Sequence, residues 1–141
     1  MKRQDPAELE SLCRRKGLRL TSQRKAILTA LAGRSDHPTA DRLYDQIQPG
    51  LPEISRTTVY RVLEKLVEAG VARTVSHPGS VSRFEAIGPR HHHLACRRCS
   101  SLTDIAAPGL NELPLPSTRG LSFRIEDYSI LFMGICTECK E

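Results

Sequence analysis

The sequence lacks any long apolar run. No stretch approaches the roughly 18 consecutive apolar residues of a membrane-spanning helix, so we expect no membrane span. The first ten residues contain Lys2 and Arg3 but no apolar segment typical of a secretory signal, and we therefore expect a cytoplasmic protein. Compositional bias is also absent. Apolar residues make up 39% and charged residues 26%, which excludes a disordered or collagen-like chain.

The charge is unevenly distributed over the 141 residues. Residues 1–83 carry 15 Lys or Arg against 9 Asp or Glu, whereas residues 84–141 carry 6 against 7. Three of the five histidines and four of the five cysteines follow residue 90. This length allows one domain, or two very small ones that a dimer would stabilise. The basic first half favours polyanion binding, and the ligand-rich second half favours metal chemistry.

The first half of the chain shows a pattern of short helices followed by a hairpin. Residues that cap helices precede apolar residues at helical spacing, and Gly or Pro-Gly follows each helix. The predicted N-caps are Asp5, Thr21 or Ser22, Thr39 and Ser55, and the predicted ends are Gly17, Gly33, Pro49-Gly50 and Gly70. Two β-prone runs, 71–75 and 81–86, flank a turn at 76–80. This order is typical of a winged helix-turn-helix.

The last predicted helix, residues 55–69, has the features of a DNA-recognition helix. Its apolar stripe leaves Arg56, Thr57, Tyr60 and Arg61 outward in the N-terminal half, which reaches base edges and phosphates in such domains. One amphipathic helix by itself is more often a solvated surface. The wing and the positive charge of the first half favour double-stranded DNA as the partner.

Two C-x-x-C pairs, Cys96 with Cys99 and Cys136 with Cys139, lie 36 residues apart. Two such turns can place four thiolates around one tetrahedral Zn²⁺, so we predict a structural zinc site. Disulfides are less expected without a secretory signal, and a thioredoxin-like motif would need βαβ units. The fifth cysteine, Cys13, is predicted to be a buried apolar residue.

Strand-like stretches surround these pairs at residues 91–95, 101–105 and 121–135, the last one bent near 126–127. Prolines limit any helix between them to a short one near 108–113. Such a small sheet with one zinc and little core predicts a homodimer.

The run His91-His92-His93 indicates a second metal site. On a strand, His91 and His93 share a face and can bind one ion together, whereas His92 points away. Further candidate ligands are His37, Glu85 and Asp104. Imidazoles and carboxylates suit Fe²⁺, Mn²⁺ or Zn²⁺, and a surface histidine cluster is the alternative. His92 and His77 are predicted to lie at the surface.

Five segments, in order, resemble the ferric uptake regulator family of bacterial repressors. They are Arg-Leu-Thr-Ser-Gln-Arg at 19–24, His-Pro-Thr-Ala-Asp at 37–41, Ser-Arg-Thr-Thr-Val-Tyr-Arg at 55–61, Ser-Arg-Phe-Glu at 82–85 and the histidine run with the first Cys pair at 91–99. The resemblance implies an α+β homodimer that binds AT-rich inverted repeats when loaded with a regulatory metal. A winged helix-turn-helix domain would span 1–85, a hinge 86–90 and a zinc-stapled α/β dimerisation domain 91–141.

The resemblance also implies roles for individual residues. The implied ligands of a structural Zn²⁺ are Cys96, Cys99, Cys136 and Cys139. The implied ligands of a regulatory Fe²⁺ or Mn²⁺ are His37, Glu85, His91, His93 and Asp104. Arg19, Ser55 and Thr58 are implied as further DNA contacts. A further metal site of some family members is not expected, because Arg90 and Tyr128 stand where those proteins have histidines. The chain is most similar to the peroxide-stress regulator branch, although Glu85 is more typical of the iron-sensing branch.

The sequence therefore predicts a metal-dependent repressor that senses hydrogen peroxide. Two alternatives remain open, an iron-responsive repressor without peroxide sensing and a constitutive zinc-stabilised nucleic-acid-binding module. A metal-dependent hydrolase is not favoured, because no nucleophile or general base is apparent beyond the ligands themselves. We expect no enzyme activity and no small-molecule substrate beyond the metal ion and peroxide.

Overall fold

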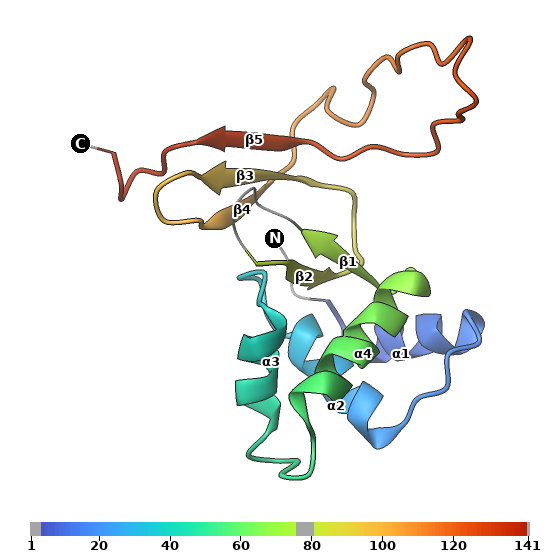
Figure 1. Ribbon diagram of the computed structural model, residues 1–141, viewed down its shortest axis with the longest axis vertical. Helices are drawn as coiled ribbons and strands as arrows, with labels where there is room; N and C mark the ends of the chain where they lie inside the picture. Colours follow the sequence, from blue (N-terminus) through green and yellow to red (C-terminus); the bar gives the residue numbers. More distant parts are fainter. Residues whose placement is uncertain (1–3, 76–80, 141) are drawn as a thin grey trace. The chain divides into compact units, whose positions relative to one another are not determined.

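The computed structural model describes residues 4–75 and 81–140 (Figure 1). The chain divides into two compact units, Met1–Gly88 and Pro89–Glu141, which are called unit 1 and unit 2 below and are described separately. Among the described residues, no helix is long and apolar enough to cross a membrane.

The described part of unit 1 contains four helices, each begun by a predicted capping residue. The helices are α1 (Pro6–Arg15), α2 (Ser22–Ala32), α3 (Ala40–Ile47) and α4 (Arg56–Glu68). The caps are Asp5, Thr21, Thr39 and Ser55, whose side-chain oxygens accept hydrogen bonds from backbone N–H groups at 3.0–3.2 Å. These bonds satisfy donors that the first helical turn cannot pair internally. Thr21 is therefore the N-cap of α2 rather than Ser22.

The core of unit 1 lies between the helices and a two-stranded hairpin. Leu28, Leu43 and Leu63 come from α2, α3 and α4 and are fully buried, and Cys13 of α1 is buried with them as predicted. Gly70 adopts a left-handed conformation, with φ of +76°, after α4. Strand β1 (Ala72–Val75) then pairs antiparallel with β2 (Arg83–Ala86). The winged helix-turn-helix is thus present, and the predicted turn at 76–80 lies outside the described residues.

Unit 2 is built on a three-stranded sheet with β3 at its centre. Strand β3 (His92–Cys96) pairs antiparallel with β4 (Leu102–Ile105) and parallel with β5 (Leu131–Gly134). A long segment without helix or strand, residues 106–130, connects β4 to β5 (Figure 1). It is called the excursion below.

One sequence-based expectation for this segment is wrong. The strand predicted over 121–135 is confined to β5, because only that part pairs with β3. The region near 108–113, where the prolines leave room only for a short helix, forms a turn, in which Glu112 N–H donates to the Gly109 carbonyl at 3.2 Å. The φ of Gly109 is +86°, which is incompatible with a right-handed helix.

His92 and Tyr128 anchor the excursion to β3. Ile130 N–H donates to His92 Nδ1 at 3.1 Å, so the ring proton lies on Nε2 and is donated to Asn111 Oδ1 at 2.9 Å. The Tyr128 ring stacks on His92 with centroids 5.9 Å apart, and its hydroxyl donates to the Leu110 carbonyl at 2.6 Å. His92 is 1% exposed, so its prediction as a surface residue was wrong: the excursion folds back over that face of β3.

The anchoring role of Tyr128 predicts the effect of removing its hydroxyl. Tyr128→Phe leaves the Leu110 carbonyl without its donor and Leu113 N–H without its acceptor at 3.1 Å. We expect a loss of about 1–2 kcal/mol in the free energy of unfolding, measured by urea denaturation at fixed protein concentration. Tyr60→Phe, at an exposed position, is the matched control and should leave this free energy unchanged. Equal stability of the two variants would contradict the anchoring role.

Candidate metal centres and nucleic-acid interface

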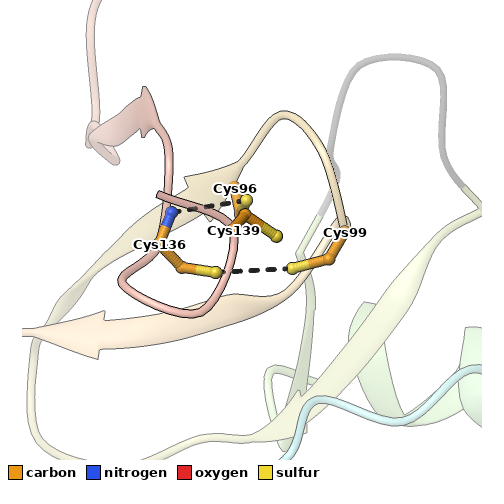
Figure 2. Close-up of side chains that lie close together, drawn as sticks. All are labelled: Cys96, Cys99, Cys136 and Cys139. Carbon is orange, nitrogen blue, oxygen red and sulfur yellow. Dashed lines mark hydrogen bonds between the residues drawn. The ribbon is translucent and has the colours of Figure 1, made fainter. Parts of the chain in front are cut away.

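Unit 2 brings the four cysteines of the two C-x-x-C pairs together. Their sulfur atoms all lie within 4.8 Å of one another. Cys96 is the last residue of β3 and Cys99 lies in the turn that follows it, whereas Cys136 and Cys139 come from the segment that follows β5 (Figure 2). The parallel pairing of the two strands sets Cys96 opposite Gly134 and so brings the second turn to the first.

The spacing of the sulfurs fits a tetrahedral ion and not a disulfide. Cys99 Sγ lies 3.7 Å from Cys136 Sγ. A disulfide bond measures about 2.0 Å, whereas the edge of a tetrahedron with Zn–S bonds of about 2.3 Å is about 3.8 Å. The cysteines are all free thiols in the structure. The donor set therefore fits Zn²⁺, as the sequence spacing predicts.

The proton affinities of these thiols also indicate a cation site. Backbone hydrogen bonds from Cys99 and Cys136 lower the pKa of Cys96 to about 6. Hydrogen bonding of its thiol to the Cys136 sulfur, and then to that of Cys99, raises the pKa of Cys139 to about 12. Hydrogen bonds with Ser101 also lower the pKa of Cys99. The cluster thus favours thiolates at Cys96 and Cys99 and retains a proton on Cys139, which a divalent cation would displace.

A second group of ligand-type side chains lies within unit 1. His37, between α2 and α3, has its Nε2 atom 3.2 Å from Oε2 of Glu85 on β2. Phe84 N–H donates to the Pro38 carbonyl at 2.9 Å, which holds β2 alongside the segment that carries His37. His37 has a φ of +51°, a left-handed conformation that costs an L-residue about 1–2 kcal/mol. The two candidate ligands predicted for this half of the chain are thus neighbours.

A third group, in unit 2, contains two histidines and one carboxylate. The Nε2 atoms of His91 and His93 each lie 3.5 Å from Oδ1 of Asp104, which stands opposite His93 on β4. The two imidazole rings are 4.8 Å apart, on one side of the strand as the alternation predicts. His91 Nδ1 lies 2.9 Å from the Pro89 carbonyl, which can only accept a hydrogen bond. The proton therefore sits on Nδ1 and leaves Nε2 as the ligand atom.

Six of the seven predicted DNA-binding residues lie at the N-cap or in the N-terminal half of α4. Ser55, Arg56, Thr57, Tyr60 and Arg61 are exposed, Thr58 is half-buried, and Arg19 is exposed before α2. Arg56 differs from the others because α3 already engages it. Its guanidinium donates to Asp41 at 2.8 Å and lies 4.5 Å above the ring of Tyr44. Arg56 therefore links the two helices of the helix-turn-helix.

Sequence reasoning overlooked Arg34 and Asp36. The two side chains form a two-pronged ion pair, with Nε–Oδ1 and Nη2–Oδ2 distances of 2.9 and 2.6 Å, directly before His37. Arg34 also donates from Nη1 to Gln46 of α3 at 3.0 Å. The available signal was the order Arg-Ser-Asp-His at residues 34–37, which sets a short ion pair beside a candidate ligand.

Comparison with known proteins shows which sequences this chain is similar to. A sequence model of the ferric uptake regulator family matches residues 15–133. The peroxide-responsive repressor PerR of Staphylococcus epidermidis is 32% identical over 145 residues, which cover 96% of this chain and 97% of that protein. PerR of Staphylococcus aureus strain Mu50 is 33% identical over 128 residues, which cover 91% and 86%.

Solved structures share the fold. The ferric uptake regulator of Helicobacter pylori superposes with a TM-score of 0.78 at 22% identity and covers 100% of this chain and 98% of its own. A zinc-bound manganese uptake regulator superposes with a TM-score of 0.69 at 28% identity and covers 91% and 98%. The predicted fold class, a winged helix-turn-helix domain followed by a small C-terminal α/β domain, is confirmed.

Removal of one thiolate tests the cysteine cluster. Cys136→Ser should abolish tight zinc binding and destabilise unit 2 by several kcal/mol, because the ion would lose one of four ligands. Zinc content by mass spectrometry and urea unfolding measure both effects. Cys13→Ala is the control, since it removes a buried thiol of unit 1 and should retain zinc in full. Retention of one zinc per chain by Cys136→Ser would show that the ion binds elsewhere.

Proposed function

The chain belongs to the ferric uptake regulator family, and from this premise we propose that it is a metal-gated repressor that binds an AT-rich inverted repeat as a homodimer. Family membership makes it a metal-responsive transcriptional repressor and not an enzyme. The observation that carries the proposal is the occurrence of nitrogen and oxygen ligand groups in both units, beside a separate sulfur cluster.

The two kinds of donor set suit two kinds of ion. The thiolates of the four cysteines favour a structural Zn²⁺, whereas imidazole and carboxylate groups favour Fe²⁺ or Mn²⁺. Within unit 1, His37 and Glu85 offer only two ligands. Within unit 2, His91, His93 and Asp104 offer three. Neither group fills the coordination sphere of Fe²⁺ or Mn²⁺, and we propose that the five residues hold one regulatory ion together.

An ion shared between the two units would control DNA binding. Gly88 and Pro89 join unit 1 to unit 2 and lie in the predicted hinge. Ligands from both sides of this hinge would restrict the orientation of the DNA-binding unit relative to its partner. In a symmetric dimer that orientation sets the distance between the two α4 helices, which must match successive major grooves. The ion favours the DNA-binding state only by its higher affinity for that state.

The dimer is proposed to form through the sheet of unit 2. Leu94, Phe132, Met133 and Ile135 are large apolar residues of β3, β5 and the turn that follows β5, and each is at least 38% exposed. Leu94 and Phe132 are register partners and share one face of the sheet, and exposed apolar residues that share a face mark an interaction surface. A second copy of unit 2 would bury them and would place two winged helices on one operator.

We also propose that the protein senses hydrogen peroxide, and its similarity to the PerR repressors supports this role. Bound Fe²⁺ would supply the electrons that activate peroxide beside its ligands. Oxidation of His37 or His91 would then remove a ligand and release the protein from DNA. An iron-responsive repressor without peroxide sensing is the second candidate. Glu85 favours it, because a longer carboxylate chelates differently from the Asp that is usual in the peroxide branch.

Operator binding under defined metal conditions tests the proposal. Zinc-containing protein, either free of regulatory metal or loaded with Mn²⁺ or Fe²⁺, is titrated onto a fluorescent inverted-repeat duplex with and without hydrogen peroxide. We expect binding with either metal and loss of binding only for the Fe²⁺ form with peroxide, together with the mass of one added oxygen on His37 or His91. Equal binding without regulatory metal would support the constitutive module. Persistent binding of the peroxide-treated Fe²⁺ form would support iron sensing.

One variant of Glu85 distinguishes peroxide sensing from iron sensing, because it changes the length of the side chain that carries the carboxylate. Glu85→Asp retains the charge and shortens the side chain by one methylene. We expect faster histidine oxidation in the Fe²⁺ form with peroxide and retained Mn²⁺-dependent operator binding. Mass spectrometry of peptides that contain His37 and His91 gives the rate. Glu64→Asp, on the exposed face of α4, is the matched control. An unchanged rate of histidine oxidation in Glu85→Asp would show that the residue at position 85 does not determine whether the protein senses peroxide.

A further inference from the structure

The backbone conformation of His37 raises the question of what holds its side chain in place. Its φ of +51° lies in the left-handed region, which histidine adopts only in a small minority of cases. A residue in such a conformation persists only where its surroundings fix it. The segment that carries it, residues 34–38 between the C-cap of α2 and the N-cap of α3, belongs to no helix or strand.

Polar contacts fix the chain on both sides of His37. On the N-terminal side, the Arg34 fork binds both carboxylate oxygens of Asp36, at 2.9 and 2.6 Å. On the C-terminal side, the Pro38 carbonyl accepts from Phe84 N–H at 2.9 Å. His37 is thus the residue between two anchored neighbours.

Arg34 also joins this segment to the helix that follows it. Its Nη1 atom donates to Gln46 Oε1 of α3 at 3.0 Å, while Nε and Nη2 are on Asp36. One planar guanidinium therefore connects the end of α2, the residue before His37 and the last turn of α3. The Arg34 side chain is 24% exposed, and the rigid fork of a guanidinium defines direction as well as distance.

We propose that Arg34, Asp36 and Gln46 form a positioning cluster that presents His37 to the regulatory ion and thereby sets the affinity of the site for Mn²⁺ and Fe²⁺. This inference rests on the proposed function, because it takes His37 as a ligand. The cluster does not touch the ion. Ion pairs with solvent-exposed members contribute little to the free energy of unfolding. We therefore expect the cluster to affect the position of the His37 side chain rather than global stability.

Two substitutions of Arg34 test the cluster. Arg34→Ala removes the fork, and Arg34→Lys retains the charge but cannot bond to both oxygens of Asp36 while reaching Gln46. We expect Arg34→Ala to raise the Kd of the zinc-containing dimer for Mn²⁺ about tenfold, which is the size of effect found for other residues that orient metal ligands. Arg34→Lys should not restore the Kd of the parent protein. Calorimetry measures this Kd. Operator affinity at saturating Mn²⁺ and zinc content should be unchanged.

A second readout needs no regulatory metal. In zinc-containing Arg34→Ala without regulatory metal, amide hydrogen exchange at Asp36 and His37 should be faster than in the parent protein. Exchange within α4 should stay the same. Arg124→Ala is the matched control for both measurements. Arg124 pairs with Glu126 at 2.6 Å with the same spacing in sequence, but in unit 2 and beside no candidate ligand. It should change neither the Kd for Mn²⁺ nor the exchange at His37.

His37→Ala separates failure of this inference from failure of the proposed function. If His37→Ala weakens Mn²⁺ binding and Arg34→Ala does not, the positioning role is overturned and the ligand role stands. If His37→Ala leaves the Kd unchanged, the proposed ligand set is wrong and the positioning role is overturned with it. An Arg34→Ala protein that binds the operator more weakly even at saturating Mn²⁺ has a general defect of unit 1, and this result also overturns the inference.

Discussion

The pairing of β3 with strands on both sides is the constraint on which unit 2 depends. Because side chains alternate along a strand, five consecutive residues serve different purposes. His93 faces Asp104 across the pairing with β4, His92 faces the other way and holds the excursion, and Cys96 ends the strand at the sulfur cluster. The pairing with β5 then delivers the second cysteine pair. A slip of one residue in this register would exchange the roles of the histidines and separate the thiols.

Unit 1 combines a rigid framework with a strained point. Capped helices and a fully apolar core need no metal to be well packed, and they hold α4 with its exposed N-terminal half. The strain lies at His37, between α2 and α3. As the proposed ligand, His37 would respond to an ion without disturbing the packing that positions α4.

Local signals made unit 1 and the cysteine cluster predictable. A capping residue such as Thr39 or Ser55 acts on an amide three residues away, and a C-x-x-C pair is itself a turn. The excursion was not predictable, because it forms neither helix nor strand and Tyr128 contacts His92 from 36 positions further along the chain. The surface assignment of His92 failed for the same reason. His37 and Glu85 were anticipated as candidate ligands of one site, and the family resemblance assigned them to the regulatory ion. The hydrogen bond from Arg34 to Gln46 was missed because these residues lie 12 positions apart.

The order of the cysteine pairs along the chain has a consequence for synthesis. Unit 1 precedes unit 2 and has its own core, so it can fold as soon as it has left the ribosome. The sulfur cluster cannot close until β5 and the turn of Cys136 and Cys139 have followed, 36 residues after the first pair. In the proposed homodimer, two chains could therefore pair through finished sheets only after the second thiol pair has been made.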